Sequence, residues 1–150
     1  MIAFFHDGLA VETFTNLCGL GMVEIARTGF AFDLDLKPAV LVRMVIQEFY
    51  SVSEEEILGR SRVARIAWAR LTAMALIREF LPTLSHQQVA EELKRANYAS
   101  SIRASLRVQD SEDLFNETAG ELREIRRRIK EALDIRRALI RELSMEGGVL

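Results

Sequence analysis

The chain has 150 residues, of which 49% are hydrophobic and 28% are charged, a balance typical of a globular protein and not of a disordered one. No run of roughly 20 apolar residues is present, so no membrane-spanning helix is predicted. The first residues lack the basic head and cleavage site of a secretory signal, and the one cysteine, Cys18, cannot form an internal disulfide. These features predict a cytoplasmic protein.

The net charge of −2 hides an uneven distribution along the chain. Residues 1–59 carry three bases and nine acids, and residues 108–120 carry four acids and no base. Residues 60–107, by contrast, carry nine bases and three acids, and residues 121–150 carry eight bases and six acids. Affinity for a polyanion grows with the number of phosphates that are neutralised, so the block 60–107 is a candidate polyanion-binding segment.

The N-terminal third has the weakest structural signals. Glycines interrupt residues 1–37, whereas Phe30–Leu36 alternates strictly between apolar and polar positions after its first residues, which predicts a strand. A hairpin with Met22–Arg27 and an irregular arm are both compatible with this pattern. We therefore treat 1–37 as an N-terminal arm.

Clear helix signals begin at Pro38, which suits the first turn of a helix that reaches Phe49. Ser53-x-x-Glu56 is a capping box and opens a short helix that ends near Gly59. Apolar spacing then predicts a long helix over 61–80, which Pro82 terminates.

A second capping box, Ser85-x-x-Gln88, opens a helix over 86–94 whose inward residues are expected to be Val89, Ala90 and Leu93. A turn at Lys94–Asn97 leads into another helix through about Val108. Two short helices joined by such a turn and resting on a longer helix predict a helix-turn-helix, in which the second helix points its N-terminal side chains at base edges.

An acidic run at Asp110–Asp113 is expected to separate this helix from the next segment, and residues 114–145 are expected to form one or two helices. The predicted fold class is therefore all-α, with a helix-turn-helix domain over 38–113 and a C-terminal helical extension over 114–150.

Three segments of the middle region carry a family resemblance. Ile46–Tyr50 and Glu54–Leu58 look like the family's opening helix and its acidic-leucine turn, and Arg70–Leu76 is similar to its Arg-Gln-x-Ala-Met-x-Leu segment. Ser85–Leu93 corresponds to its Ser-Leu-x-x-Ile-Gly-x-x-Phe helix. Residues 46–108 thus resemble the C-terminal DNA-binding domain of the bacterial replication initiator DnaA, within the Trp-repressor-like helix-turn-helix group.

The family's most diagnostic motif is altered in this chain. That motif is Gly-Gly-Arg-Asp-His-Thr-Thr-Val and reads a DNA box in the major groove, and here the run is Lys94-Arg95-Ala96-Asn97-Tyr98-Ala99-Ser100-Ser101. Asn97 can still cap the helix and Ser100 keeps a hydroxyl, but the motif's arginine and histidine are replaced. The resemblance therefore implies DNA binding without naming the sequence that is read.

The resemblance also implies which residues contact DNA. It assigns the minor-groove arginine to Arg70, where a narrow groove attracts positive charge, and phosphate contacts to the bases that flank the second helix. The full set expected at double-stranded DNA is Arg60, Arg62, Arg65, Arg70, Lys94, Arg95, Asn97, Tyr98, Ser100, Ser101, Arg103 and Arg107. The competing interpretation is that the arginines are solvated surface residues and that Tyr98 is a core aromatic side chain closing the turn.

No enzyme signature is present in the sequence. It lacks the phosphate loop of an ATPase module, a nucleophile elbow and any Cys/His spacing typical of a metal site. With only His6 and His86 as histidines, no metal, no cofactor and no catalytic residue is expected.

The C-terminal extension carries an apolar stripe at helical spacing. It consists of Leu122, Ile125, Ile129, Leu133, Leu139, Ile140 and Leu143. Packing within the chain is the default interpretation, and the alternative is a homodimer, because helix-turn-helix proteins often bind two half-sites through a two-fold axis.

The function predicted from these observations is double-stranded DNA binding at the nucleoid by a regulator of replication or transcription. Two alternatives remain open. The chain could be an interaction module that kept the fold without DNA binding, or a DNA-binding remnant of a transposase.

Overall fold

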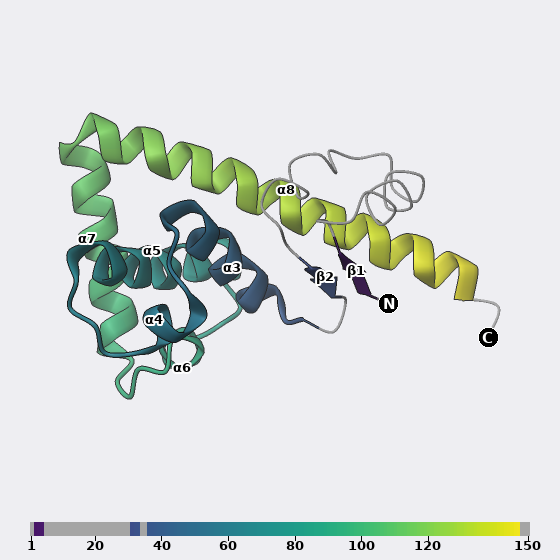
Figure 1. Ribbon diagram of the computed structural model, residues 1–150, viewed down its shortest axis with the longest axis horizontal. Helices are drawn as coiled ribbons and strands as arrows, with labels where there is room; N and C mark the ends of the chain where they lie inside the picture. Colours follow the sequence, from purple (N-terminus) through teal and green to yellow (C-terminus); the bar gives the residue numbers. More distant parts are fainter. Residues whose placement is uncertain (1, 5–30, 34–35, 148–150) are drawn as a thin grey trace. The chain divides into compact units, whose positions relative to one another are not determined.

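The computed structural model describes residues 2–4, 31–33 and 36–147, and it divides the chain into two compact units. One unit is Pro38–Arg127, and the other combines Met1–Lys37 with Arg128–Leu150 (Figure 1). Within the described ranges, none of the helices combines the length and apolar character that a bilayer crossing requires.

The unit Pro38–Arg127 is built from helices alone, which confirms the predicted all-α class. Its long helix α5 contacts the four helices α3, α4, α6 and α7, which lie around it (Figure 1). In chain order the helices are α3 (Pro38–Tyr50), α4 (Glu54–Leu58), α5 (Ala64–Phe80), α6 (His86–Glu92), α7 (Ala99–Leu114) and α8 (Asn116–Gly147), the last of which continues into the other unit.

The core of this unit lies around α5. Ala69, Ala73 and Ile77 are completely buried along α5, and the two small alanines let neighbouring helices approach closely. Val89, Ala90 and Leu93 are also completely buried, as predicted from their spacing. The pair α6 and α7 therefore rests on α5 through an apolar face, which fixes the helix-turn-helix on the bundle.

Both predicted capping boxes are confirmed. The backbone N–H of Glu56 donates to Ser53 Oγ at 3.1 Å, and the N–H of Ser53 donates to Glu56 Oε1 at 3.0 Å. The same reciprocal pair joins Ser85 and Gln88, at 3.1 and 2.8 Å. Each box satisfies two N–H groups that lack helical partners, so the two short helices begin where the sequence predicted.

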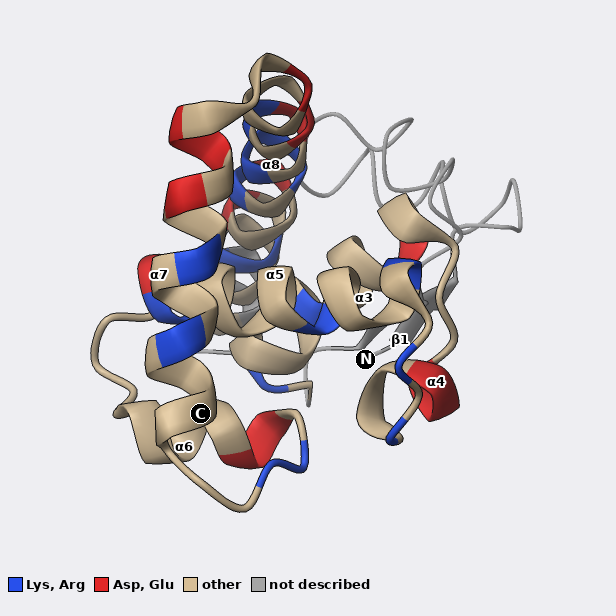
Figure 2. Cartoon of the chain, turned by 90° about the vertical axis from the view of Figure 1, so that its left-hand side faces the viewer, with Lys and Arg blue, Asp and Glu red and all other residues tan. Residues whose placement is uncertain are grey.

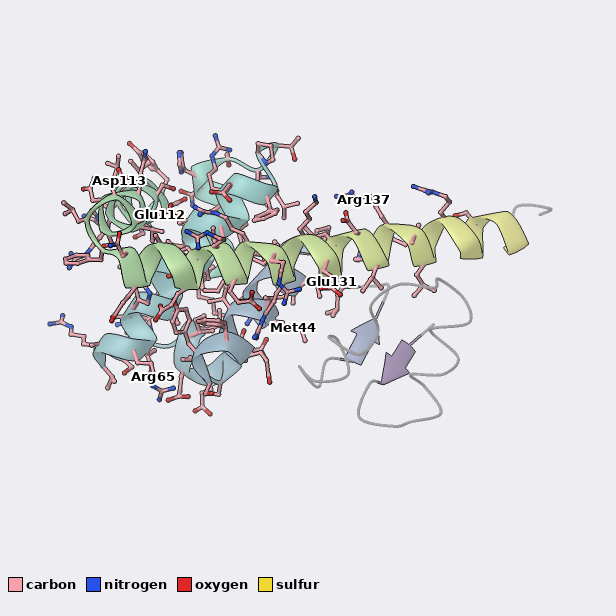
Figure 3. The ribbon with its side chains drawn as sticks, turned by 90° about the horizontal axis from the view of Figure 1, so that it is seen from above. Met44, Arg65, Glu112, Asp113, Glu131 and Arg137 are labelled. Atoms are coloured by element: carbon pink, nitrogen blue, oxygen red, sulfur yellow. The ribbon has the colours of Figure 1, made fainter. Side chains whose placement is uncertain are left out.

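The predicted end of α7 is wrong. The helix does not stop near Val108 but continues through the acidic run to Leu114, and α8 begins after the single non-helical residue Phe115. One carboxylate of the run is held by α8, since Arg126 Nη2 donates to Glu112 Oε1 at 2.9 Å, and Figure 3 shows Glu112 beside that helix. Arg126 Nε also donates to Glu79 Oε2 on α5 at 2.9 Å, so one guanidinium joins three helices.

A second junction joins α3, α5 and α8. Trp68 Nε1 donates to the Tyr50 hydroxyl at 2.9 Å, and that hydroxyl donates to Glu121 Oε2 at 3.3 Å. Burial raises the pKa of Tyr50 to about 12, so the hydroxyl keeps its proton at neutral pH.

In the other unit, β1 (Ile2–Phe4) pairs antiparallel with β2 (Ala31–Asp33), and Ile2 lies opposite Asp33. The alternating pattern therefore does mark a strand, but its partner is β1. Met22–Arg27, the partner considered from the sequence, lies outside the described residues, as does His6. In this unit Arg136 Nη2 also donates to the Leu36 carbonyl at 2.7 Å.

Most of the C-terminal apolar stripe is buried within the chain. Leu122 and Ile125 in one unit, and Ile129, Leu133 and Leu139 in the other, are at most 7% exposed. Ile140 is 37% exposed, and Leu143 lies outside the described side chains. The burial of these five residues agrees with the default interpretation, in which the stripe packs within one chain. Dimerisation through the stripe stays a prediction.

The Glu112–Arg126 pair makes stability depend on pH. Hydrogen bonding to Arg126 lowers the pKa of Glu112 from its ordinary value of 4.5. A depressed carboxyl pKa adds stability above the unfolded-state value and loses it as the pH falls through the folded-state value. Glu112→Gln should lower the free energy of unfolding by roughly 1 kcal/mol near neutral pH, and this difference should vanish in strong acid.

Urea unfolding followed by circular dichroism, at neutral pH and at successively lower pH values, measures how the difference between the two proteins declines. The matched control is Asp113→Asn, because Asp113 is exposed and forms no ion pair with any residue in the described ranges. Equal effects of the two substitutions at neutral pH would contradict the assignment.

Candidate nucleic-acid interface

The turn between α6 and α7 is closed by backbone hydrogen bonds and contains one residue in the left-handed region. Lys94 has a φ of 54°, while the N–H of Arg95 donates to the Ala90 carbonyl at 2.8 Å. A positive φ favours glycine, which the resembled motif has at this position. A lysine here accepts backbone strain and adds a positive charge at the end of α6.

The next residues fix the start of α7. Tyr98 occupies the N-cap position of α7, and Asn97 Oδ1, one residue earlier, accepts a hydrogen bond from the N–H of Ala99 at 2.8 Å. Ser101 is completely buried, and its hydroxyl lies 2.9 Å from Nδ1 of His86 on α6. Ser101 therefore joins the two helices and is not available for the DNA contact expected of it.

Arg70 is buried and satisfied by the protein itself. Its side chain is 8% exposed, and its three nitrogens donate to carbonyl oxygens of Ile57, Ser61 and Glu56 at 2.8, 3.1 and 3.1 Å. Burial, with the nearby charge of Arg95, lowers the pKa of Arg70. The minor-groove role implied by the resemblance is corrected here, because this guanidinium binds the end of α4 and the following loop.

Arg95 and Arg65 bind carbonyl groups as well. Arg95 is partly buried and donates to the carbonyls of Leu58 and Gly59, which ties the α6–α7 turn to the end of α4. Arg65 is exposed, as Figure 3 shows, but its Nη1 donates to the Tyr50 carbonyl at 2.9 Å and also to the Ser51 carbonyl. These contacts cap helix C-termini, where carbonyls lack helical partners.

The five remaining predicted bases are exposed and form no ion pair with a described residue. They come from the loop after α4, the turn after α6 and the part of α7 that ends at Arg107. We call them the basic face: Arg60, Arg62, Lys94, Arg103 and Arg107.

Two observations place these segments together. Arg95 bonds the end of α4 directly, and the charge of Arg60 contributes to lowering the pKa of Arg95. Figure 2 shows blue segments in the loop after α4, in the turn after α6 and on the earlier part of α7, whereas red segments follow them toward the end of α7. The arrangement presents positive charge around the start of the second helix of the helix-turn-helix.

The outer side of α7 carries two residues of the predicted set, Tyr98 and Ser100, and two exposed apolar residues that the sequence did not point to. Tyr98 is 56% exposed, so the interpretation of it as a core residue is wrong, while Ser100 is half-buried. Ile102 and Leu106, at 36% and 59% exposed, lie one and two helical turns further along. Their spacing from Tyr98, four residues each time, is the signal that would have found them.

The strained turn yields the first prediction for this site. Lys94→Gly should raise the free energy of unfolding by about 1 kcal/mol, because glycine occupies a positive φ without steric cost. Lys94→Ala removes the same charge and keeps the strain, so it should not stabilise the protein. Thermal and urea unfolding of both variants measure the difference, and equal stability of the two would contradict this role of the turn.

The internal hydrogen bonds of Arg70 lead to a second prediction for this site. Arg70→Met keeps the apolar stem but leaves three carbonyls without a donor, and should lower the free energy of unfolding by about 2 kcal/mol. Arg70→Lys, which retains one donating group, should have an intermediate effect. The matched control, Arg62→Met, removes an exposed arginine and should change stability little.

Two comparisons agree with this geometry. A family model described as the bacterial dnaA protein helix-turn-helix matches residues 41–108. The chromosomal replication initiator protein DnaA 1 of Chlamydia muridarum (strain MoPn / Nigg) is 34% identical over 104 residues, which are 68% of this chain and 22% of that relative. The chain thus spans about a fifth of the relative's length. Residues 41–108 belong to the family of bacterial DnaA helix-turn-helix domains.

Proposed function

We propose that this chain binds double-stranded DNA through the basic face, with the N-terminal half of α7 in the major groove. The observation that carries the proposal is the set of five exposed bases, which surround the second helix of a helix-turn-helix and form no ion pair with a described residue. Such bases lose little by meeting phosphates, because no internal carboxylate has to be released.

The twelve residues predicted from the sequence divide by task in this proposal. Arg60, Arg62, Lys94, Arg103 and Arg107 contact phosphates, and Tyr98 and Ser100 face the groove. Arg65, Arg70, Arg95, Asn97 and Ser101 act as positioning residues, since their polar groups bond within the protein. The process served is regulation of replication or transcription at the nucleoid, in keeping with the name of the relative.

A salt titration tests the proposal. A fluorescent duplex of mixed sequence is titrated with the full chain at several salt concentrations, and the logarithm of the affinity is plotted against that of the salt concentration. Arg103→Ala with Arg107→Ala should weaken binding and flatten the slope by roughly 0.9 for each phosphate contact removed.

The control is Arg137→Ala, which removes an exposed arginine that pairs with Asp134 at 3.2 Å and lies outside the basic face. It should leave both affinity and slope unchanged. No binding at low salt, or an affinity indifferent to salt, would sink the proposal.

One observation favours the alternative of a protein-interaction module. Leu114 and Phe115, at the corner between α7 and α8, are 75% and 58% exposed. Exposed neighbouring apolar side chains mark protein contacts when they form a patch. If that is their role, the unaltered chain should self-associate in sedimentation, and Phe115→Ser should abolish this self-association. Neither protein should then bind DNA.

A further inference from the structure

The outer side of α7 carries an uncovered apolar stripe. Tyr98, Ile102 and Leu106 are 56%, 36% and 59% exposed, and their spacing of four residues puts them on one side of the helix. The opposite side, with Ser101, Ala104 and Val108 buried, packs on the bundle; we call the exposed trio the α7 stripe. Single exposed apolar residues are ordinary, but an aligned set marks a contact surface.

The charges beside the α7 stripe indicate the kind of partner. Arg103 directly follows Ile102, and Arg107 directly follows Leu106, and both arginines are exposed. Lys94 lies just before the start of α7. A partner for this surface therefore needs anionic groups next to apolar ones, and the DNA major groove offers both in its phosphates and in the C5-methyl group of thymine.

The polar side chains at the start of α7 are largely occupied. Ser101 is buried against His86 at 2.9 Å, and Asn97 Oδ1 accepts from the backbone of Ala99 at 2.8 Å. Ala96 and Ala99 have no polar side-chain atoms. Hydrogen-bonded reading of base edges by this turn is thereby left chiefly to Tyr98 and Ser100, and the exposed side chains of Ile102 and Leu106 beyond them are hydrocarbon.

We propose that the α7 stripe, centred on Ile102, reads thymine through its methyl group, so that this chain favours thymine-rich duplexes. The inference rests on the proposed function, because it requires DNA in the groove facing α7. It deepens that function by naming the base feature that is recognised and the residues that recognise it.

The test exploits deoxyuridine, which pairs like thymidine but lacks the methyl group. The probes are a 30-base-pair alternating dA-dT duplex and the same duplex with every dT replaced by dU. The full chain should bind the dT duplex about four-fold more tightly for each methyl group contacted, the value expected for one buried methyl. Ile102→Ala should bring the ratio of the two affinities close to one.

The matched control is Leu114→Ala, which shortens another exposed apolar side chain of the same helix outside the α7 stripe and should preserve the ratio. A wild-type ratio near one, with salt-dependent binding intact, would overturn the inference and leave the proposed function standing. Failure to bind either duplex at low salt would overturn both. Loss of self-association in Ile102→Ala without any DNA binding would assign the α7 stripe to a protein partner instead.

Discussion

The guanidinium groups of Arg70 and Arg95 bind the carbonyl oxygens at the end of α4, and the geometry of the basic face depends on these bonds. A helix leaves its last carbonyls without helical partners, and in the five-residue helix α4 these carbonyls are a large share of the backbone acceptors. Arg70, which is buried, donates to the carbonyls of Glu56, Ile57 and Ser61. Arg95, in the α6–α7 turn, donates to the carbonyls of Leu58 and Gly59. The loop with Arg60 and Arg62 is thus tied to the turn with Lys94.

This arrangement separates two kinds of arginine within one basic segment. Arg70 and Arg95 use their donors internally, and desolvation lowers the pKa of each. Arg62, Arg103 and Arg107 keep their donors in solvent. The charge of Arg60 contributes to lowering the pKa of Arg95, so some charge repulsion accompanies the tie between the loop after α4 and the α6–α7 turn.

Much of the fold followed from local sequence signals, because capping boxes and helical periodicity act over three or four residues. Ser53–Glu56 and Ser85–Gln88 set the starts of α4 and α6 as predicted. The end of α7 did not follow from the sequence, since the acidic run is kept helical by Arg126, which is distant in the chain. The task of Arg70 was equally inaccessible, because charge is visible in a sequence whereas burial against carbonyls is not.

The charges of α7 run against the preference of an isolated helix. Its first turn has no acid and its last turn has no base, although a helix is stabilised by acids at its N-terminus and bases at its C-terminus. Along α7 the exposed bases Arg103 and Arg107 precede the acids Asp110 and Asp113, so the side-chain charges are separated in the same direction as the backbone dipole. The summed dipole exerts a torque in the field of a polyanion. If the domain binds a duplex as proposed, this torque would orient α7 toward the phosphates before contact forms, and the association rate would rise for that reason.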